Sequence, residues 1–351
     1  MISSLILALP LLIPMPRWET HGPPYPIDAV AVAADGTIYA AARYVSQDAS
    51  WLYRSNDNHG EWMRIATAPG GERVRQLATD PTSSARLLAA TRSETGVSLY
   101  RTDDSGSSWS FELADNYPGD SFRIFFDPTR PDTAFYVGSS LQRSRGSGPW
   151  EFISRHDYNG FPAYTTSSWV APDGTLYWIN SGCTLQWVGG RCVHWVQYTY
   201  VSSNAGETSE VLGAPYCLYL RTIAFADPRV AYASEPGCSD LLRSEDAGLS
   251  WEPYDPSGGL ASVLSGRTIT QLLIDPRNPT TIYALATAEG DESAGEILWS
   301  RDSGQTWSVF PGPGGVGVTA VALDTSGAMV VGTTNGVFVE SRQTRMLPTR
   351  E

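Results

Sequence analysis

The sequence predicts an all-β protein, a seven-bladed β-propeller built from four-stranded antiparallel blades. Two observations carry this prediction. A pattern of the type Ser-x-Asp-x-Gly-x-Thr-Trp returns along the chain at intervals of 42 to 58 residues, and short apolar runs with strand spacing lie between its copies. Self-similarity at such a period is typical of propellers and solenoids, and four strands per repeat select a propeller.

The repeated pattern is a turn whose corner is fixed by local chemistry. In residues 300–307 the carboxylate of Asp302 can accept hydrogen bonds from backbone N–H groups, and Gly304 supplies a positive φ. The stretches 102–109 and 244–251 match fully, whereas 55–62, 144–150 and 202–208 match in part. The residues expected to play a structural role in these turns are Asp57, Asp104, Asp246, Asp302, Trp62, Trp109, Trp251 and Trp307.

Each repeat shows three apolar runs before the turn, and the Trp after the turn opens a fourth strand. The expected strands of the first three blades are 29–33, 37–41, 51–54 and 62–65; 74–79, 87–91, 99–101 and a strand from Trp109; and 122–126, 134–137, 141–143 and 150–153. The fourth blade has 168–170 and 176–180, followed by a long insertion over 181–201. The last three have 222–226, 230–233, 241–243 and a strand from Trp251; 269–274, 282–286, 297–299 and 307–310; and 318–323, 329–333 and 337–340.

The seventh repeat lacks a Trp-led fourth strand. Residues 18–24, which begin with Trp18, are similar to the segments that follow the other turns. We therefore expect the N-terminal segment to supply the missing outer strand, because this closes the ring and removes an exposed sheet edge. The expected organisation is an apolar leader over 1–16, a single propeller over 17–346 and a tail over 347–351.

Composition and charge limit the classes of partner. The chain of 351 residues has a net charge of −13 and a pI near 4.8, which argues against a nucleic-acid partner. No cluster of His, Cys and Asp has metal-ligand spacing, and no Gly-rich phosphate loop occurs, so we expect neither a metal nor a cofactor. The chain is expected to be a monomer.

The N-terminus resembles a weak export signal. The apolar run over 1–16 is too short to span a bilayer and lacks a basic n-region. We expect an extracellular or cell-envelope location and no integral membrane segment. The four cysteines, Cys183, Cys192, Cys217 and Cys238, allow up to two disulfides in three connectivities.

The turn resembles the Asp-box of BNR-repeat β-propellers, a superfamily that includes sialidases, xyloglucan-cleaving glycosidases, sortilin-type receptors and photosystem II assembly factors. The resemblance covers the chain after residue 16. It implies the propeller fold but no single function. In size and number of blades the chain is most similar to the photosystem II assembly factors, which carry an arginine patch that contacts a membrane-protein partner.

The first strand of such a blade lines the central channel, and arginines gather at the start of these strands. Arg73, Arg75, Arg123, Arg221 and Arg267 would form an anion-binding arrangement at one channel mouth, opposite to the Asp turns. The alternative is that they pair with Asp28 and Asp120 and stabilise the rim. Loops on the same face add tyrosines, and the expected ligand-binding set is Arg75, Arg123, Arg221, Arg267, Tyr117, Tyr158 and Tyr164.

These observations are consistent with two functions. The leading hypothesis is an exported, non-catalytic propeller that binds a protein or glycan through its Arg- and aromatic-rich face. The alternative is an exo-acting, sialidase-like glycoside hydrolase, since Phe122-Arg123-Ile124-Phe125 resembles the Phe-Arg-Ile-Pro signature of sialidases. The signature's Pro is absent here, and sialidases have six blades where this sequence predicts seven. No catalytic residue is assigned.

Overall fold

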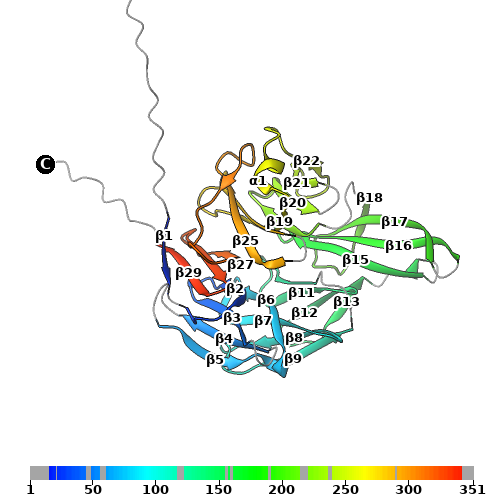
Figure 1. Ribbon diagram of the computed structural model, residues 1–351. Helices are drawn as coiled ribbons and strands as arrows, with labels where there is room; N and C mark the ends of the chain where they lie inside the picture. Colours follow the sequence, from blue (N-terminus) through cyan, green and yellow to red (C-terminus); the bar gives the residue numbers. More distant parts are fainter. Residues whose placement is uncertain are drawn as a thin grey trace, which may run out of the picture.

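A computed structural model describes residues 16–20, 22–44, 49–55, 61–116, 122–154, 157–158, 161–188, 191–213, 220–235, 239–288 and 291–341 of the chain. For 157–158, 161–164, 182–188, 191–196 and 291–294 it describes the backbone only. Within these ranges the strands form the predicted ring of seven antiparallel blades (Figure 1). The all-β propeller is therefore confirmed.

The first three blades are regular four-stranded sheets. Their strands are β2 (Ile27–Val32), β3 (Ile38–Tyr44), β4 (Ala49–Ser55) and β5 (Met63–Thr67); β6 (Arg73–Asp80), β7 (Ser83–Ser93), β8 (Gly96–Thr102) and β9 (Ser110–Asp115); and β10 (Arg123–Phe126), β11 (Thr133–Val137), β12 (Leu141–Arg145) and β13 (Glu151–Ser154). A short 3-10 helix, Pro69–Gly71, connects the first two blades.

The fourth blade carries one additional short strand. Its strands are β14 (Asp157–Tyr158), β15 (Phe161–Val170), β16 (Leu176–Val188), β17 (Arg191–Ser202) and β18 (Glu210–Gly213). The insertion predicted over 181–201 extends β16 and β17 into a long hairpin that projects from the ring (Figure 1). The hairpin register places Cys183 opposite Trp195 and Cys192 opposite Trp187.

The last three blades complete the ring. Their strands are β19 (Thr222–Phe225), β20 (Ala231–Glu235), β21 (Ser239–Ser244) and β22 (Glu252–Pro253); β23 (Thr268–Ile274), β24 (Ile282–Ala288), β25 (Asp291–Ser300) and β26 (Ser308–Val309); and β27 (Val318–Leu323), β28 (Met329–Thr333), β29 (Gly336–Ser341) and β1 (Arg17–Thr20). The helix α1 (Leu260–Leu264) lies between the fifth and sixth blades.

The N-terminal strand closes the ring, as predicted. β1 pairs antiparallel with β29, with Trp18 opposite Glu340, so segments from the two ends of the described chain share one sheet (Figure 1). The indole N–H of Trp18 also donates to the Pro311 carbonyl oxygen at 2.9 Å. Both links hold the first and last parts of the chain together.

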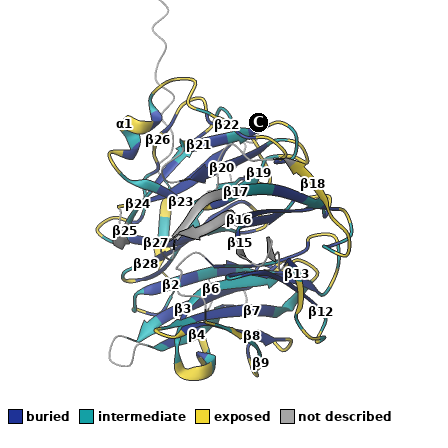
Figure 2. Ribbon diagram, turned by 90° about the vertical axis from the view of Figure 1, so that its right-hand side faces the viewer, coloured by how far each residue is buried: buried dark blue, intermediate teal, exposed yellow. Residues whose placement is uncertain are grey.

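The hydrophobic core lies between the blades. Each neighbouring pair of blades shares a cluster of buried side chains; Tyr232 of the fifth blade, for example, packs with Ile282 and Trp307 of the sixth. Buried residues concentrate within the blades, whereas many turns are exposed (Figure 2). The inner strands are therefore fixed from both sides, and they position the channel wall.

The repeated turns are built as the sequence indicates. Asp302 accepts hydrogen bonds from the Thr306 amide at 2.9 Å, the Thr306 hydroxyl at 2.6 Å and the Ser300 hydroxyl at 2.8 Å. Asp104 and Asp246 make the same set of bonds. Strands β9, β22 and β26 begin one residue after the Trp, because its backbone still belongs to the turn while its ring packs between blades.

Candidate functional site

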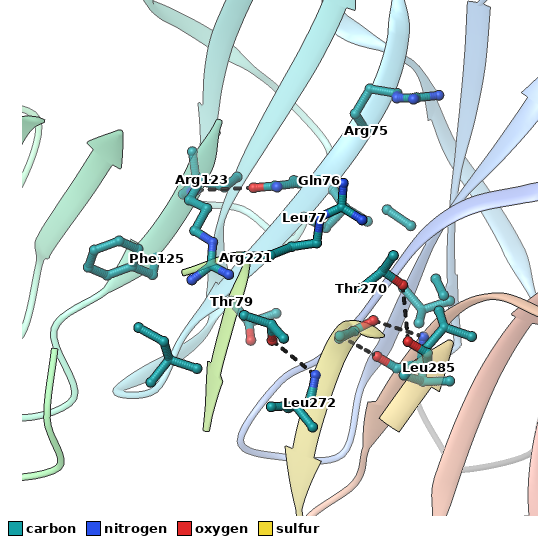
Figure 3. A pocket seen from close by; sticks show the side chains of 18 of the residues that line it. Arg75, Gln76, Leu77, Thr79, Arg123, Phe125, Arg221, Thr270, Leu272 and Leu285 are labelled. Carbon is teal, nitrogen blue, oxygen red and sulfur yellow. Dashed lines mark hydrogen bonds between the residues drawn. The ribbon is translucent and has the colours of Figure 1, made fainter. Parts of the chain in front are cut away.

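The inner strands of all seven blades enclose a central cavity of about 760 Å³. β2, β6, β10, β15, β19, β23 and β27 each contribute to its wall, which Figure 3 shows from close by. The register of β10 with β11 pairs Arg123 with Val137, so the start of an inner strand lies at the end of the second strand, on the face opposite the Asp turns. The arginines at the starts of the inner strands therefore gather at one mouth of the cavity.

The cavity wall is strongly positive. Among the described residues that line it, five are arginines and one is an aspartate: Arg43, Arg73, Arg75, Arg123, Arg221 and Asp28. The whole chain carries a net charge of −13. The positive lining is thus a local feature that opposes the overall charge, and it favours an anionic ligand.

Asp28 neutralises part of this charge. Arg73 donates to the two carboxylate oxygens of Asp28 from Nε and Nη2, both at 2.7 Å, and Arg43 donates from Nη2 at 2.6 Å. Burial raises the pKa of Asp28, but hydrogen bonds and charges from Arg73 and Arg43 outweigh it, so its pKa lies below the usual value. Asp28 therefore stays ionised near neutral pH and is poorly suited to act as a general acid.

Arg123 is the least compensated arginine of the wall. Among the described residues its guanidinium has no hydrogen-bond or ion-pair partner, although part of the side chain is accessible to water within the channel. Desolvation by the surrounding protein lowers its pKa to about 10, which leaves it charged at neutral pH. Figure 3 shows its side chain extending from the level of Gln76 toward Thr79.

The structure brings three of the four predicted arginines to one cavity. Arg75 on β6, Arg123 on β10 and Arg221 just before β19 all line it (Figure 3). Arg221 is exposed, and its Nη1 lies 3.5 Å from the Thr268 hydroxyl. Arg267 does not line the cavity; its guanidinium turns to Glu296 at 3.1 Å, because the residue follows α1 rather than an extended approach to the strand.

Several predicted residues lie where no side chain is described. Tyr117 and Asp57 lie outside the described residues, as do Asp120, Cys217 and Cys238. Tyr158 on β14 and Tyr164 on β15 are described in their backbone alone, so no aromatic contribution to the mouth is assigned.

Polar residues of the wall that the sequence analysis did not single out join neighbouring blades. The Gln76 amide donates to the Phe122 carbonyl at 2.8 Å and accepts from the Ile124 amide at 3.1 Å, on either side of Arg123. The Gln271 amide donates to the Val321 carbonyl at 2.7 Å and accepts from the Val321 amide at 3.4 Å. The sequence contains a pattern that could have identified these glutamines. When the repeats are aligned on the Asp-Pro that ends these inner strands, Gln76, Arg123 and Gln271 occupy the same position.

Among the described residues no group of three or more His, Cys, Asp or Glu side chains is arranged to hold a metal ion. Within the same part of the chain, no helix has the length and apolar character needed to cross a membrane.

Comparison with known proteins supports the fold. No protein-family model matches the chain. It is 24% identical over 314 residues to a xyloglucanase of Hypocrea jecorina (strain QM6a), and the match covers 76% of this chain but only 36% of that enzyme. The chain thus spans about a third of its curated relative's length.

Solved structures show the same ring of blades. YCF48 from Cyanidioschyzon merolae superposes with a TM-score of 0.59 at 13% identity, covering 92% of this chain and 98% of that one. YCF48 bound to D1 peptide gives 0.58 at 13%, covering 93% and 97%. The GH74 enzyme of Niastella koreensis gives 0.51 at 13%, covering 87% and 62%. The protein therefore has a β-propeller fold, similar to those of YCF48 and of the GH74 enzyme.

Proposed function

We propose that this protein is a non-catalytic binding propeller that holds an anionic protein or glycan partner at the arginine-lined mouth of its channel. The observation that carries the proposal is the excess of five arginines over one aspartate in the cavity wall of a chain whose net charge is −13. Guanidinium groups bind carboxylates through paired, charge-assisted hydrogen bonds, and they keep their charge at any physiological pH.

The exposed position of Arg221 supports this role, because a partner can reach it from solvent. Arg75 lies across the same cavity on a different blade, so a ligand that spans the mouth meets both. The likeness to YCF48, one structure of which is bound to D1 peptide, adds a protein partner to the candidates. The apolar run over 1–16 supports export to the cell envelope or beyond.

The proposal is tested with the immobilised full chain and two arrays, one of acidic and neutral peptides and one of charged and neutral glycans. Acidic ligands should bind and neutral ones should not, with affinity falling as salt rises. The double variant Arg75→Ala and Arg221→Ala should weaken binding at least about tenfold.

Two arginines on the Asp-turn face provide the matched control. Arg145 and Arg243 pair with Glu207 and Glu245, outside the cavity. Replacing both by Ala removes the same number of positive charges and should leave ligand binding unchanged. Equal loss in the two double variants would mean that net charge alone attracts the ligands, and it would refute the assignment of the mouth.

The second candidate is an exo-acting glycoside hydrolase, favoured by the sequence similarity to a xyloglucanase. Glycosidases of this kind use a pair of carboxylates that flank the scissile bond. In the described part of the cavity wall the one carboxylate is Asp28, which Arg43 and Arg73 hold ionised, and this makes binding the better-supported function. Release of sugar from xyloglucan oligosaccharides or from a panel of fluorogenic glycosides would establish the enzyme instead.

A further inference from the structure

Arg123 places inside the channel a positive charge that no described residue compensates. Its side chain extends from the level of Gln76 toward Thr79 (Figure 3). Among the described residues its guanidinium makes no hydrogen bond and no ion pair. A desolvated cation is costly in a folded protein unless an anion accompanies it.

The wall itself offers little to neutralise this charge, since its polar groups are committed elsewhere. The Thr79 hydroxyl donates to the Val32 carbonyl at 2.9 Å, and the Thr222 hydroxyl accepts from the Leu272 amide at 2.9 Å. The Gln76 amide bonds to the backbone on either side of Arg123. These bonds hold the blades together, so they are expected to persist.

The carboxylate that lines the cavity is also committed. Asp28 accepts from Arg43 and Arg73 through both of its oxygens. Arg221 adds a second positive charge to the same cavity, and its bond to Thr268 supplies no negative charge in return. The cavity of about 760 Å³ has ample room for a small ion.

We propose that the channel contains an internal binding site for a small oxyanion, a free carboxylate or phosphate, centred on the guanidinium of Arg123. This site goes beyond the proposed function, because it requires no macromolecular partner. The ion would complete the electrostatics of the channel wall and stabilise the ring.

The test is calorimetric titration of the purified full chain with inorganic phosphate and, in a second arm, with acetate, at constant ionic strength. One ion should bind per chain, and the stronger arm identifies the oxyanion class. Arg123→Gln should weaken binding at least about tenfold, since one charge-assisted contact is lost. Arg145→Gln, an arginine on the opposite face, should bind as the parent chain does.

Thermal unfolding separates an anion site from a structural ion pair. Without added oxyanion, Arg123→Gln should melt at a higher temperature than the parent chain, because a partly desolvated charge without a described partner has been removed. At about five times the dissociation constant, phosphate should raise the melting temperature of the parent by about 2 °C and leave that of the variant unchanged.

Either of two results would overturn the proposal. One is a lower melting temperature of Arg123→Gln in oxyanion-free buffer, which would reveal a native carboxylate partner such as Asp120. The other is phosphate binding of equal strength in the parent and in Arg123→Gln. Partner capture by the mouth is measured separately, through Arg75 and Arg221, so failure of one proposal leaves the other standing.

Discussion

Replacing Trp18 by Ala should open the closure of the ring. Trp18 packs edge-on to Phe310, with ring centroids 6.2 Å apart, and its indole donates to Pro311 at 2.9 Å. Replacing a fully buried Trp by Ala costs about 3–5 kcal/mol of folding free energy. Because Trp18 is partly exposed, we expect the lost packing to cost about 2 kcal/mol. The lost hydrogen bond adds about 1 kcal/mol, which gives about 3 kcal/mol in total.

For a chain of this size the loss corresponds to a fall in melting temperature of about 4–6 °C. Scanning calorimetry of the parent and variant chains measures it. The matched control is Thr20→Ala, an exposed position on the same strand, which should shift the melting temperature by about 1 °C or less. If Trp18→Ala and Thr20→Ala melt at the same temperature, the β1–β29 pairing does not hold the ring closed.

Three further predictions concern the wall and the turns. Gly248→Ala should lower the free energy of unfolding, measured by urea denaturation, by about 1–3 kcal/mol more than Gly315→Ala does. Both glycines have a positive φ, but only at Gly248 would a Cβ lie 2.7 Å from the rigid Trp169 ring. Equal losses in the two variants would contradict this packing. Gln76→Ala should cost about 2–4 kcal/mol in the same assay, since it leaves two backbone groups of the neighbouring blade unpaired, and a neutral effect would show that water replaces the amide. Asp28→Asn should lower the free energy of unfolding at pH 7, and the difference in stability from the parent should shrink as pH falls below about 4. The reason is that a carboxyl whose pKa is lowered by folding loses its contribution to stability when it is protonated. A stability difference independent of pH would exclude the ion pairs as its source.

Local chemistry made the blades predictable. In Asp302 and Gly304 the turn carries its own acceptor and its own positive φ, so the corner forms from residues within a few positions of each other. Repetition of that corner indicated six blades, and the apolar runs between 318 and 340 added the seventh. The closing strand was also predictable, because Trp18 repeats the position that Trp307 occupies after its turn.

The candidate site was predictable only in part. Arg75, Arg123 and Arg221 were found because the start of an inner strand always faces the same mouth. Arg267 also lies just before an inner strand, but it follows helix α1 and its guanidinium pairs with Glu296 instead of lining the cavity. The role of Arg43 could not be deduced either, because it reaches Asp28 from the second strand of its blade.

The sequence by itself determined the blade repeat, the closure of the ring and the face on which arginines gather, because these depend on short-range turn chemistry and strand periodicity. Only the tertiary structure decided which of those charges are neutralised. Asp28 binds Arg73, 45 residues away on another blade, while Arg123 finds no such partner among the described residues. Ion pairing depends on distances of a few ångströms between side chains of different blades, and no spacing along the chain encodes them.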